Sequence, residues 1–207
     1  RVVLEPTDAT YYTEALREID VTDLESDDER RVGEGTLHRG RGVVKEYYPL
    51  YRKKRLSNDN VIATESTGLE DPVELHTDLC WLTLPQSVVE DIDAGHSEPE
   101  SFLGGLHAVE HGMINMTPLE LKLDKKDLGG MSTRQHPETE RATMFIYDGV
   151  EGGLGFAHEI YDRFEVLSEH TGDLIEDCGC DGVEGCPGCV MDYMCGSNNE
   201  PLHTEAA

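Results

Sequence analysis

The sequence lacks the features of membrane and exported proteins. None of its apolar runs approaches the ~20 residues that a helix needs to span a bilayer, and only 37% of its 207 residues are hydrophobic. Residues 1–12 include acids where a signal peptide would need an apolar run. We therefore expect a cytoplasmic protein with no membrane partner. Because the chain starts at Arg1 and not at a Met, we also expect it to be a fragment of something longer.

Motifs of nucleotide-driven motors and of nucleophilic enzymes are missing as well. The sequence has no Gly-rich loop followed by Lys-Ser/Thr, as a Walker A motif would require, and no Asp-Glu-x-His box. No Ser-His-Asp or Cys-His nucleophile arrangement can be argued from it either. We therefore expect that this chain does not hydrolyse ATP alone.

Basic residues are scarce. The chain has 17 Lys and Arg, of which only six are Lys, against 43 Asp and Glu, giving a formal charge of −26. Such a surface repels phosphate and resembles that of proteins from halophiles, where salt screens the repulsion between carboxylates. The exception is the basic window, residues 30–55, where nine basic residues meet two acids, for a charge of +7 against −33 elsewhere. A local contact to nucleic acid is therefore expected there.

β-Branched and aromatic residues predict an α+β fold whose first part, residues 1–85, is a β-rich segment carrying a basic hairpin. This part should form a small antiparallel sheet or partial barrel. The acidic run 23–29 is expected to be a solvated loop between strands. The predicted strands centre on Val2–Leu4, Thr10–Tyr12, Val43–Val44, Tyr47–Tyr48 and Cys80–Leu84.

The second part, residues 86–207, is expected to be an α/β domain that ends in a four-cysteine zinc knuckle. Apolar spacing predicts a short helix around 88–92, a helix from Leu103 that ends near Pro118, a strand over 119–123 and a buried strand over 143–147. One longer helix should follow, since Phe156, Ile160, Phe164 and Leu167 fall at helical spacing.

Five of the six cysteines lie within 18 residues, in the pattern C-x-C-x5-C-x2-C-x5-C. Closely spaced cysteines separated by glycines can bring four thiolates together around one zinc ion, and a four-thiolate shell leaves no position for water, so the metal would be structural. An iron–sulfur cluster or disulfides are the alternatives. The sixth, Cys80, lies in an apolar strand and is expected in the core. The expected ligands are Cys178, Cys180, Cys186 and Cys189, with Cys195 as a substitute.

Residues 107–111 read H-x-x-E-H, the inverted zinc-protease motif, in which His107 and His111 would bind a metal. That site needs a third ligand, for which Glu151, Glu159 and Glu165 are candidates without a distinguishing spacing. We favour the alternative interpretation, in which these histidines pack against the sheet or bond to carboxylates.

A glycine-containing loop, residues 148–155, lies between the predicted buried strand and the last helix. Backbone N–H groups in such a place can cradle an anion, but Glu151 would repel phosphate. We therefore favour close strand–helix packing as the role of its glycines. Similarly, Asp124 and Asp127 could hold a metal, but we expect them to cap a turn.

Several segments together resemble the C-terminal region of DEAD/DEAH-box DNA helicases of the mitomycin repair factor A type, relatives of a RecQ-like fungal helicase. The resemblance covers roughly residues 1–202 and is strongest after His107. The segments that carry it are His107–His111, Asp124–Gly130, Phe145–Gly155, Cys178–Cys189 and Cys195–Leu202.

This resemblance implies an accessory region with a structural Zn²⁺, attached to motor domains of the same parent chain that bind ATP and Mg²⁺ and unwind DNA in repair. The zinc ligands implied are the four cysteines given above, with Cys195 also matching a family position. Because residues 107–111 are among the segments that resemble a helicase family, their interpretation as a protease motif becomes weaker. Without the motor motifs, this chain should not unwind DNA alone.

The natural DNA contact, single-stranded or forked, is the basic window. Its cations could neutralise phosphates, while its tyrosines could stack on unpaired bases at about 1–3 kcal/mol per base. The competing interpretation is a basic hairpin that pairs with acids of this chain. The candidate contacts are Arg39, Arg41, Lys45, Tyr47, Tyr48, Tyr51, Arg52, Lys53, Lys54 and Arg55.

Two other functions remain open at this stage. A scaffold module would dock on the motor without touching DNA and would not shift a labelled oligonucleotide. A metallopeptidase would hold a second metal and cleave peptides.

Overall fold

A six-stranded antiparallel sheet forms the frame of the molecule in this computed structural model, which describes residues 7–97 and 100–207. The strand order is β1-β2-β4-β6-β5, and β3 pairs with β2 at the outer end. The strands are β1 (Tyr11–Val32), β2 (Gly35–Arg55), β3 (Val61–Ser66), β4 (Val73–Leu84), β5 (Leu128–Thr133) and β6 (Ala142–Asp148).

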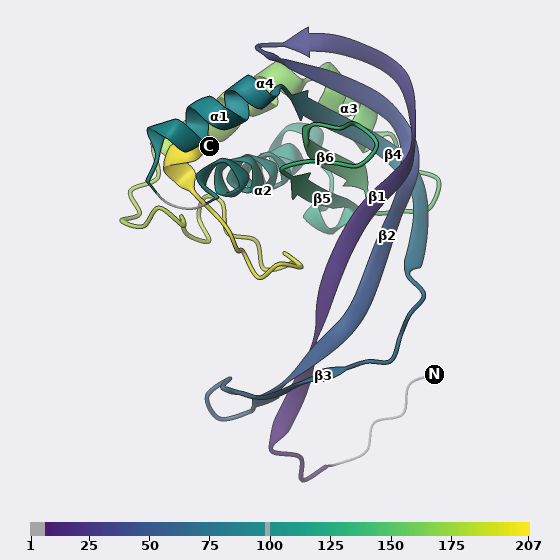
Figure 1. Cartoon of the computed structure of the whole chain (residues 1–207), viewed down its shortest axis with the longest axis vertical. Helices are drawn as coiled ribbons and strands as arrows, with labels where there is room; N and C mark the ends of the chain where they lie inside the picture. The colour runs from purple at the N-terminus through teal and green to yellow at the C-terminus, as the bar shows by residue number, and fades with distance from the viewer. Residues whose placement is uncertain (1–6, 98–99) are drawn as a thin grey trace.

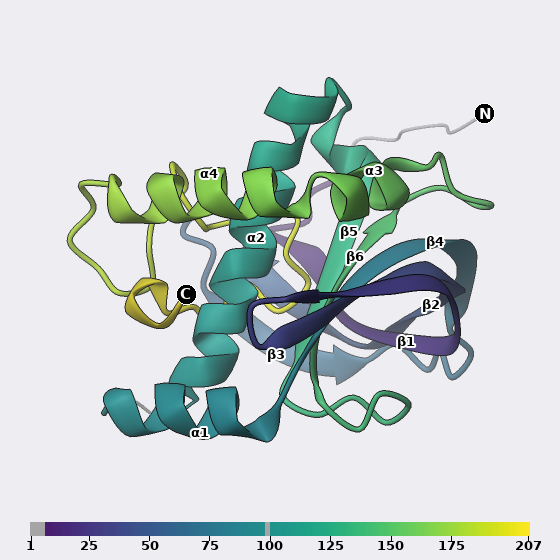
Figure 2. The ribbon, with the colours of Figure 1, turned by 90° about the horizontal axis from the view of Figure 1, so that it is seen from above.

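The helices lie beside one part of this sheet (Figure 1). The turn of the long β1–β2 hairpin curves over them, so that Arg30 of β1 contacts Tyr161 and Glu165, while the open end of the hairpin extends away. Seen from above, α4 lies across α2 (Figure 2). None of the described helices combines the length and the hydrophobicity needed to cross a membrane. The helices are α1 (Gln86–Gly95), α2 (Ser101–Leu121), α3 (Phe156–Asp162) and α4 (Phe164–Glu176), with short 3-10 turns η1 (Lys125–Asp127) and η2 (Thr204–Ala206).

Two apolar clusters cover the two faces of the sheet. On one face, side chains such as Leu37 and Ile146 pack against Phe102 and Met113 of α2 and against Ile160 of α3. Cys80 is buried in this cluster, as expected of a core residue.

On the other face the sheet curls, so that the edge strands β1 and β5 come into contact. Val21 and Val44 pack there with Trp81 and Phe145. The α+β class is therefore confirmed. β4 pairs with both β2 and β6, so strands from both sides of residue 85 belong to one sheet. The division into 1–85 and 86–207 stays a prediction.

The acidic run 23–29 is not the expected loop, because it lies inside β1. Its acids face the basic window across the hairpin: Glu25 pairs in register with Arg41 and Asp28 with Arg39. Opposite charges at directly paired strand positions attract. Register shifts on both sides of Ser26 accommodate the run.

Two other predictions from residues 86–207 are wrong in detail. The expected strand over 119–123 belongs mostly to α2, which continues past Pro118 although proline has no N–H to donate within the helix. The helix ends where Lys122 donates its N–H to the Pro118 carbonyl. The single helix expected from Phe156 is two helices, with a break at Arg163, whose N–H is shared by two carbonyls.

The other strand predictions agree with the structure where it describes them. The runs in residues 43–48 and 80–84 lie in β2 and β4, and 143–147 lies in β6. The run 10–12 overlaps the start of β1, and the predicted strand Val2–Leu4 lies outside the described residues.

Candidate metal centre

Helix α2 carries the candidate site because the C-terminal segment, residues 178–207, folds back against it. Two adjacent glycines make this approach possible. A Cβ on Gly105 would stand 2.1 Å from the Ala206 carbonyl oxygen, and one on Gly104 would stand 2.9 Å from the His203 Cβ. The His203 N–H also donates to the Gly104 carbonyl at 3.1 Å. Side chains larger than hydrogen at these positions would hold the segment away from the helix.

Four cysteine sulfurs of the C-terminal segment converge on one point, within 4.8 Å of one another. The Sγ–Sγ distances are 3.6 Å for Cys178–Cys186, 3.9 Å for Cys180–Cys189 and 3.8 Å for Cys186–Cys189. Four thiolates bound tetrahedrally at about 2.3 Å lie about 3.8 Å apart, whereas a disulfide would require about 2.05 Å. The donor set and its spacing therefore fit a zinc ion.

Backbone N–H groups donate hydrogen bonds to two of these sulfurs and so stabilise their anionic form. The Cys186 N–H donates to the Cys189 Sγ at 3.1 Å, and the Gly188 N–H donates to the Cys186 Sγ at 3.3 Å. The Gly188 hydrogen bond, with that to Cys178, lowers the pKa of Cys186 to about 7. A lowered thiol pKa favours the thiolate, which is the form that binds metal.

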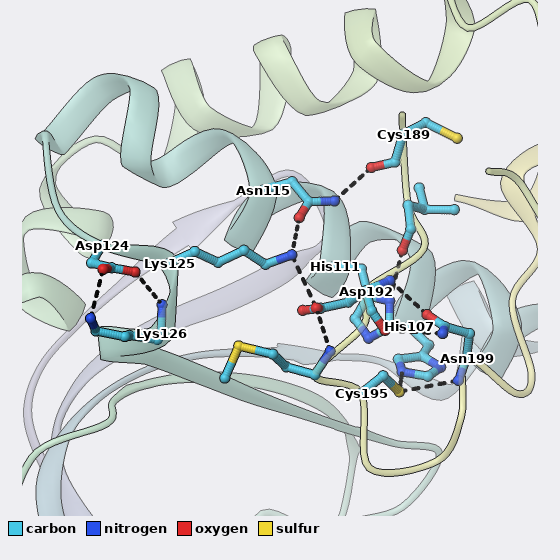
Figure 3. Close-up of polar contacts among 12 residues, drawn as sticks. His107, His111, Asn115, Asp124, Lys125, Lys126, Cys189, Asp192, Cys195 and Asn199 are labelled. Atoms are coloured by element: carbon cyan, nitrogen blue, oxygen red, sulfur yellow. Dashed lines mark hydrogen bonds and ion pairs between the residues drawn. The ribbon is translucent and has the colours of Figure 1, made fainter. Parts of the chain in front are cut away.

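The cluster is fixed to α2 through the carbonyls beside its last cysteine (Figure 3). The Asn115 side-chain amide donates to the Cys189 carbonyl at 2.7 Å. Lys125 bonds to the other end of that amide and forms a 3.1 Å ion pair with Asp192. The position of the four-cysteine segment, residues 178–189, therefore depends on side chains of α2 and η1.

Cys195 lies apart from these four sulfurs, beside the two histidines of the H-x-x-E-H motif. One ligand atom each from His107, His111 and Cys195 lie within 4.8 Å of one another. The Cys195 Sγ is 3.6 Å from His107 Nε2, 3.1 Å from Ser197 Oγ and 3.3 Å from the donating Asn199 N–H. The structure thus brings together a Cys–His pair that sequence reasoning missed, because 88 residues separate its members.

The ionisable groups of this second cluster shift one another's pKa values. Burial raises the pKa of Cys195, but the hydrogen bonds from His107 and His111 outweigh it and lower that pKa to about 4. For His107, burial lowers the pKa, whereas the Cys195 contact and the Glu110 charge raise it to about 9. Glu110 itself is buried, with a pKa raised by that burial, and bonds to Ser132.

None of the glutamates proposed as a third ligand belongs to this cluster. Glu165 pairs with Arg30, and Glu151 accepts the N–H of His76 at 3.2 Å. Glu159 forms an ion pair with Arg163. The interpretation in which the histidines bond to carboxylates is also inaccurate, since their Nδ1 atoms contact backbone carbonyls.

The glycine-containing loop is closed by its own carboxylate. Asp148, which is fully buried, accepts N–H groups from Leu154 at 2.5 Å, Phe156 at 3.1 Å and Ala157 at 2.8 Å. These are the donors that an anion would have used. A Cβ on Gly153 would stand 2.2 Å from the Asp78 carboxylate, which agrees with a packing role for the loop's glycines.

The residues Asp124 and Asp127 stand at a turn, as expected. Asp124 precedes η1 and accepts the Lys126 N–H at 3.2 Å, so it caps this turn. Asp127 contributes its carbonyl, which accepts the Gly149 N–H at 2.7 Å. Neither belongs to a metal-binding cluster among the described residues.

Most cations of the basic window are paired with acids of this chain. Among the described residues, 7–97 and 100–207, Arg52 and Arg55 are the two predicted DNA-contacting cations that form no ion pair. The pairs formed are Arg39 with Asp28 and Asp162, Arg41 with Asp78, Lys45 with Glu74, Lys53 with Glu65, and Lys54 with Glu14.

The three tyrosines of the window are partly exposed on β2. The Tyr48 hydroxyl donates to Glu46 and the Tyr51 hydroxyl donates to Glu65, both at 2.6 Å. The ring of Tyr51 also lies 5.8 Å from the Lys53 ammonium. Tyr47 lies in the same strand, in register with Glu18.

Comparison with known proteins identifies a domain in this part of the chain. The model of the MrfA Zn-binding domain family matches residues 109–190. The matched range includes His111 and the four clustered cysteines, and it leaves out His107 and Cys195.

Two relatives and one solved structure extend this match. The ATP-dependent helicase YprA of Bacillus subtilis is 29% identical over 88% of this chain, which spans only 23% of that helicase. The protein MJ1572.1 of Methanocaldococcus jannaschii is 36% identical over 47% of this chain and 88% of its own length. The crystal structure of the DUF1998 helicase MrfA bound to DNA is 26% identical, with a TM-score of 0.65, over 95% of this chain and 25% of that one.

Proposed function

Because this chain belongs to the MrfA Zn-binding domain family, we propose that it is the accessory C-terminal region of an ATP-dependent DNA helicase that acts in DNA repair. The observation that carries the proposal is the four-cysteine cluster, fixed to α2 inside a fold that follows a DNA-bound helicase over 95% of the chain. The motor domains, with their ATP and Mg²⁺, would belong to other parts of the same parent chain.

Zinc would act structurally in this role. Cys178, Cys180, Cys186 and Cys189 would hold the ion, which would close the four-cysteine segment and fix it against α2. Zinc-binding energy in small modules is also folding energy, apparently about 10–16 kcal/mol. Residues 86–207 would thus form the zinc-dependent part and residues 1–85 the part that reaches DNA.

The test of this proposal is unwinding by the parent helicase. Cys186→Ser should lose zinc and greatly reduce unwinding of a forked DNA, because the C-terminal segment would leave α2. Cys80→Ala, which removes a thiol far from the cluster, should keep its zinc and its unwinding. Full unwinding by zinc-free Cys186→Ser would contradict the structural role, and a parent chain without helicase activity would contradict the whole proposal.

DNA contact by the basic window is the finer part of the proposal. The free cations Arg52 and Arg55 and the three tyrosines lie on the same strand, so both phosphate contacts and base stacking are available there. The high acidic charge agrees with a salt-rich cytoplasm, in which phosphate contacts weaken steeply and stacking should contribute more.

Fluorescence anisotropy with labelled single-stranded DNA across a range of salt tests this contact. Replacing Arg52 and Arg55 by Gln should reduce affinity at low salt, whereas replacing Tyr47, Tyr48 and Tyr51 by Ala should reduce it at all salt concentrations. Arg163→Gln, outside the hairpin, is the control and should bind as the wild type. If neither set weakens binding, or if the chain does not bind DNA, the scaffold function is the better description.

A further inference from the structure

The second cluster is formed by His107, His111 and Cys195. Neither the family match nor the helicase function explains why these three side chains lie together. Its members come from the middle of α2 and from the C-terminal segment, and the folding of that segment against α2 brings them together (Figure 3). Both histidines are buried, with 9% and 2% exposure. Burying two imidazoles beside a half-buried thiol needs a physical reason.

The hydrogen bonds of the two histidines fix their ring orientation. His107 Nδ1 lies 2.8 Å from the Pro201 carbonyl, and His111 Nδ1 lies 2.7 Å from the Val190 carbonyl. A carbonyl can only accept, so both Nδ1 atoms carry the proton and donate. In a neutral ring the Nε2 atom then holds a free lone pair. Metal-binding histidines are oriented in this same way, by donating the other ring N–H to a carbonyl or carboxylate.

The distance between the free nitrogen and the sulfur matches metal coordination. Zinc bonds of about 2.05 Å to nitrogen and about 2.3 Å to sulfur, at the tetrahedral angle, place the two ligand atoms about 3.6 Å apart. His107 Nε2 and Cys195 Sγ are 3.6 Å apart. His111 sits one helical turn further along α2, with its ring centre 4.2 Å from that of His107.

The sulfur is also held in place from the opposite direction. Ser197 Oγ and the Asn199 N–H contact Cys195 Sγ, and hydrogen bonds of this kind to a ligating thiolate stabilise its charge. Glu110 adds a buried carboxylate beside both histidines without joining the ligand set. The Cys195 thiolate would balance one of the two positive charges of a divalent ion.

The cluster faces a cavity of about 500 Å³, which is lined by its three members and by Glu110, Ser132 and Tyr147 among others. Three protein ligands leave one tetrahedral position unfilled, and this position would open to the cavity. Structural zinc sites have four protein ligands, whereas sites with three keep a position for water or another small ligand.

We propose that His107, His111 and Cys195 form a second metal site, which takes Zn²⁺ through two imidazole nitrogens and one thiolate and keeps a fourth position open to the cavity. This site is separate from the four-cysteine cluster and does not depend on the helicase function. It also reverses the preference that the sequence alone gave for a purely structural role of the two histidines.

Elemental analysis of the complete chain, purified with Zn²⁺ and freed of excess metal, tests the proposal directly. The wild type should hold two zinc equivalents. Cys195→Ser and His111→Asn should each hold one; the Asn side chain can keep the donor to the Val190 carbonyl while removing the Nε2 ligand. His170→Asn, at a partly exposed histidine that pairs with Glu120, is the matched control and should hold two.

Two further measurements keep the result interpretable if a variant folds poorly. In wild type whose four-cysteine site stays filled, occupancy of the second site by Zn²⁺ should protect Cys195 from alkylation at least tenfold relative to the same protein with only one zinc equivalent bound. Co²⁺ should give two distinguishable thiolate-to-metal absorption bands, of which Cys195→Ser removes only one. One zinc equivalent in the wild type, together with Zn²⁺-independent alkylation of Cys195, would overturn the proposal and leave an imidazolium–thiolate pair instead.

The outcomes also separate this site from the zinc site of the proposed function. Cys186→Ser removes the ion that holds the C-terminal segment, so it should release one or both equivalents and loosen that segment. Cys195→Ser and His111→Asn should release one equivalent and leave the four-cysteine site filled. A failure of either set of variants to change the metal content would therefore identify which site is wrong.

Discussion

The buried carboxylate of Asp148 offers a sharp test of how the loop between β6 and α3 is held. Its two oxygens accept three backbone N–H groups, those of Leu154, Phe156 and Ala157, of which the last two stand at the start of α3. Asp148→Asn keeps the shape of the side chain but turns one of the two oxygens into an N–H₂ donor. That donor would face backbone donors.

The expected cost follows from the contacts that are lost. At least one hydrogen bond to a charged acceptor disappears, at about 1.5–3 kcal/mol, and the negative charge beside the first turn of α3 goes with it, at about 0.3–1 kcal/mol. The total is about 2–4 kcal/mol. For a chain of this length such a loss lowers the melting temperature by on the order of 10 °C.

Thermal unfolding followed by circular dichroism, with zinc present throughout, measures this change. Asp148→Ala, which loses all three hydrogen bonds, should melt lower still than Asp148→Asn. Asp124→Asn is the control, since Asp124 caps η1 at an exposed position where water can replace the bond. If Asp148→Asn melts within about 1 °C of the wild type, the carboxylate does not hold the loop and the magnitudes above do not apply.

Three further outcomes can be checked in the same assay. Gly105→Ala should lower stability by about 1–3 kcal/mol through overpacking against Ala206. Gly172→Ala, where a Cβ would meet nothing within 4 Å, should raise stability by up to ~1 kcal/mol. Equal effects of the two changes would contradict the close approach of the C-terminal segment to α2. The ion pair between Arg30 and Glu165 should contribute only about 0.5–1 kcal/mol of coupling energy in a double-mutant cycle, because both side chains are partly exposed; a much larger coupling energy would refute this. Raising salt from about 0.1 M to about 1 M should raise the melting temperature, because the charge of −26 repels itself less as the screening length shrinks; a fall would show that ion pairs dominate.

The elements that local pattern determines could be predicted from the sequence. The strand over 143–147 is a continuous apolar run, and its burial in β6 follows directly. The helix from residue 103 follows from its periodicity, but its predicted end near Pro118 is wrong, because α2 continues past the proline to Leu121. The acidic run 23–29 could not be assigned from its own composition, because the charges that stabilise it as a strand lie on β2.

The two candidate metal sites show the same limit of prediction from sequence. The spacing of four cysteines within 12 residues is enough to predict a metal site. The structure brings their sulfurs together. The second cluster needs Cys195 to reach α2, and no spacing reports an approach across 88 residues. The one available signal is the pair Gly104-Gly105 near the start of a helical pattern, since glycines inside such a pattern often have a packing reason.

The outer end of the long hairpin, where residues 11–16, 50–55 and 61–66 pair, extends beyond the helices (Figure 1). Its side chains are exposed or only half-buried, so backbone hydrogen bonds and ion pairs such as Lys54–Glu14 and Lys53–Glu65 hold it together. Salt screens the repulsion among the acidic residues and so stabilises the net-acidic part of the molecule, but it also weakens the attraction within such exposed ion pairs. Rising ionic strength therefore acts in opposite directions on the two ends of this molecule: it stabilises the part that holds the cysteine cluster and weakens the outer end of the hairpin.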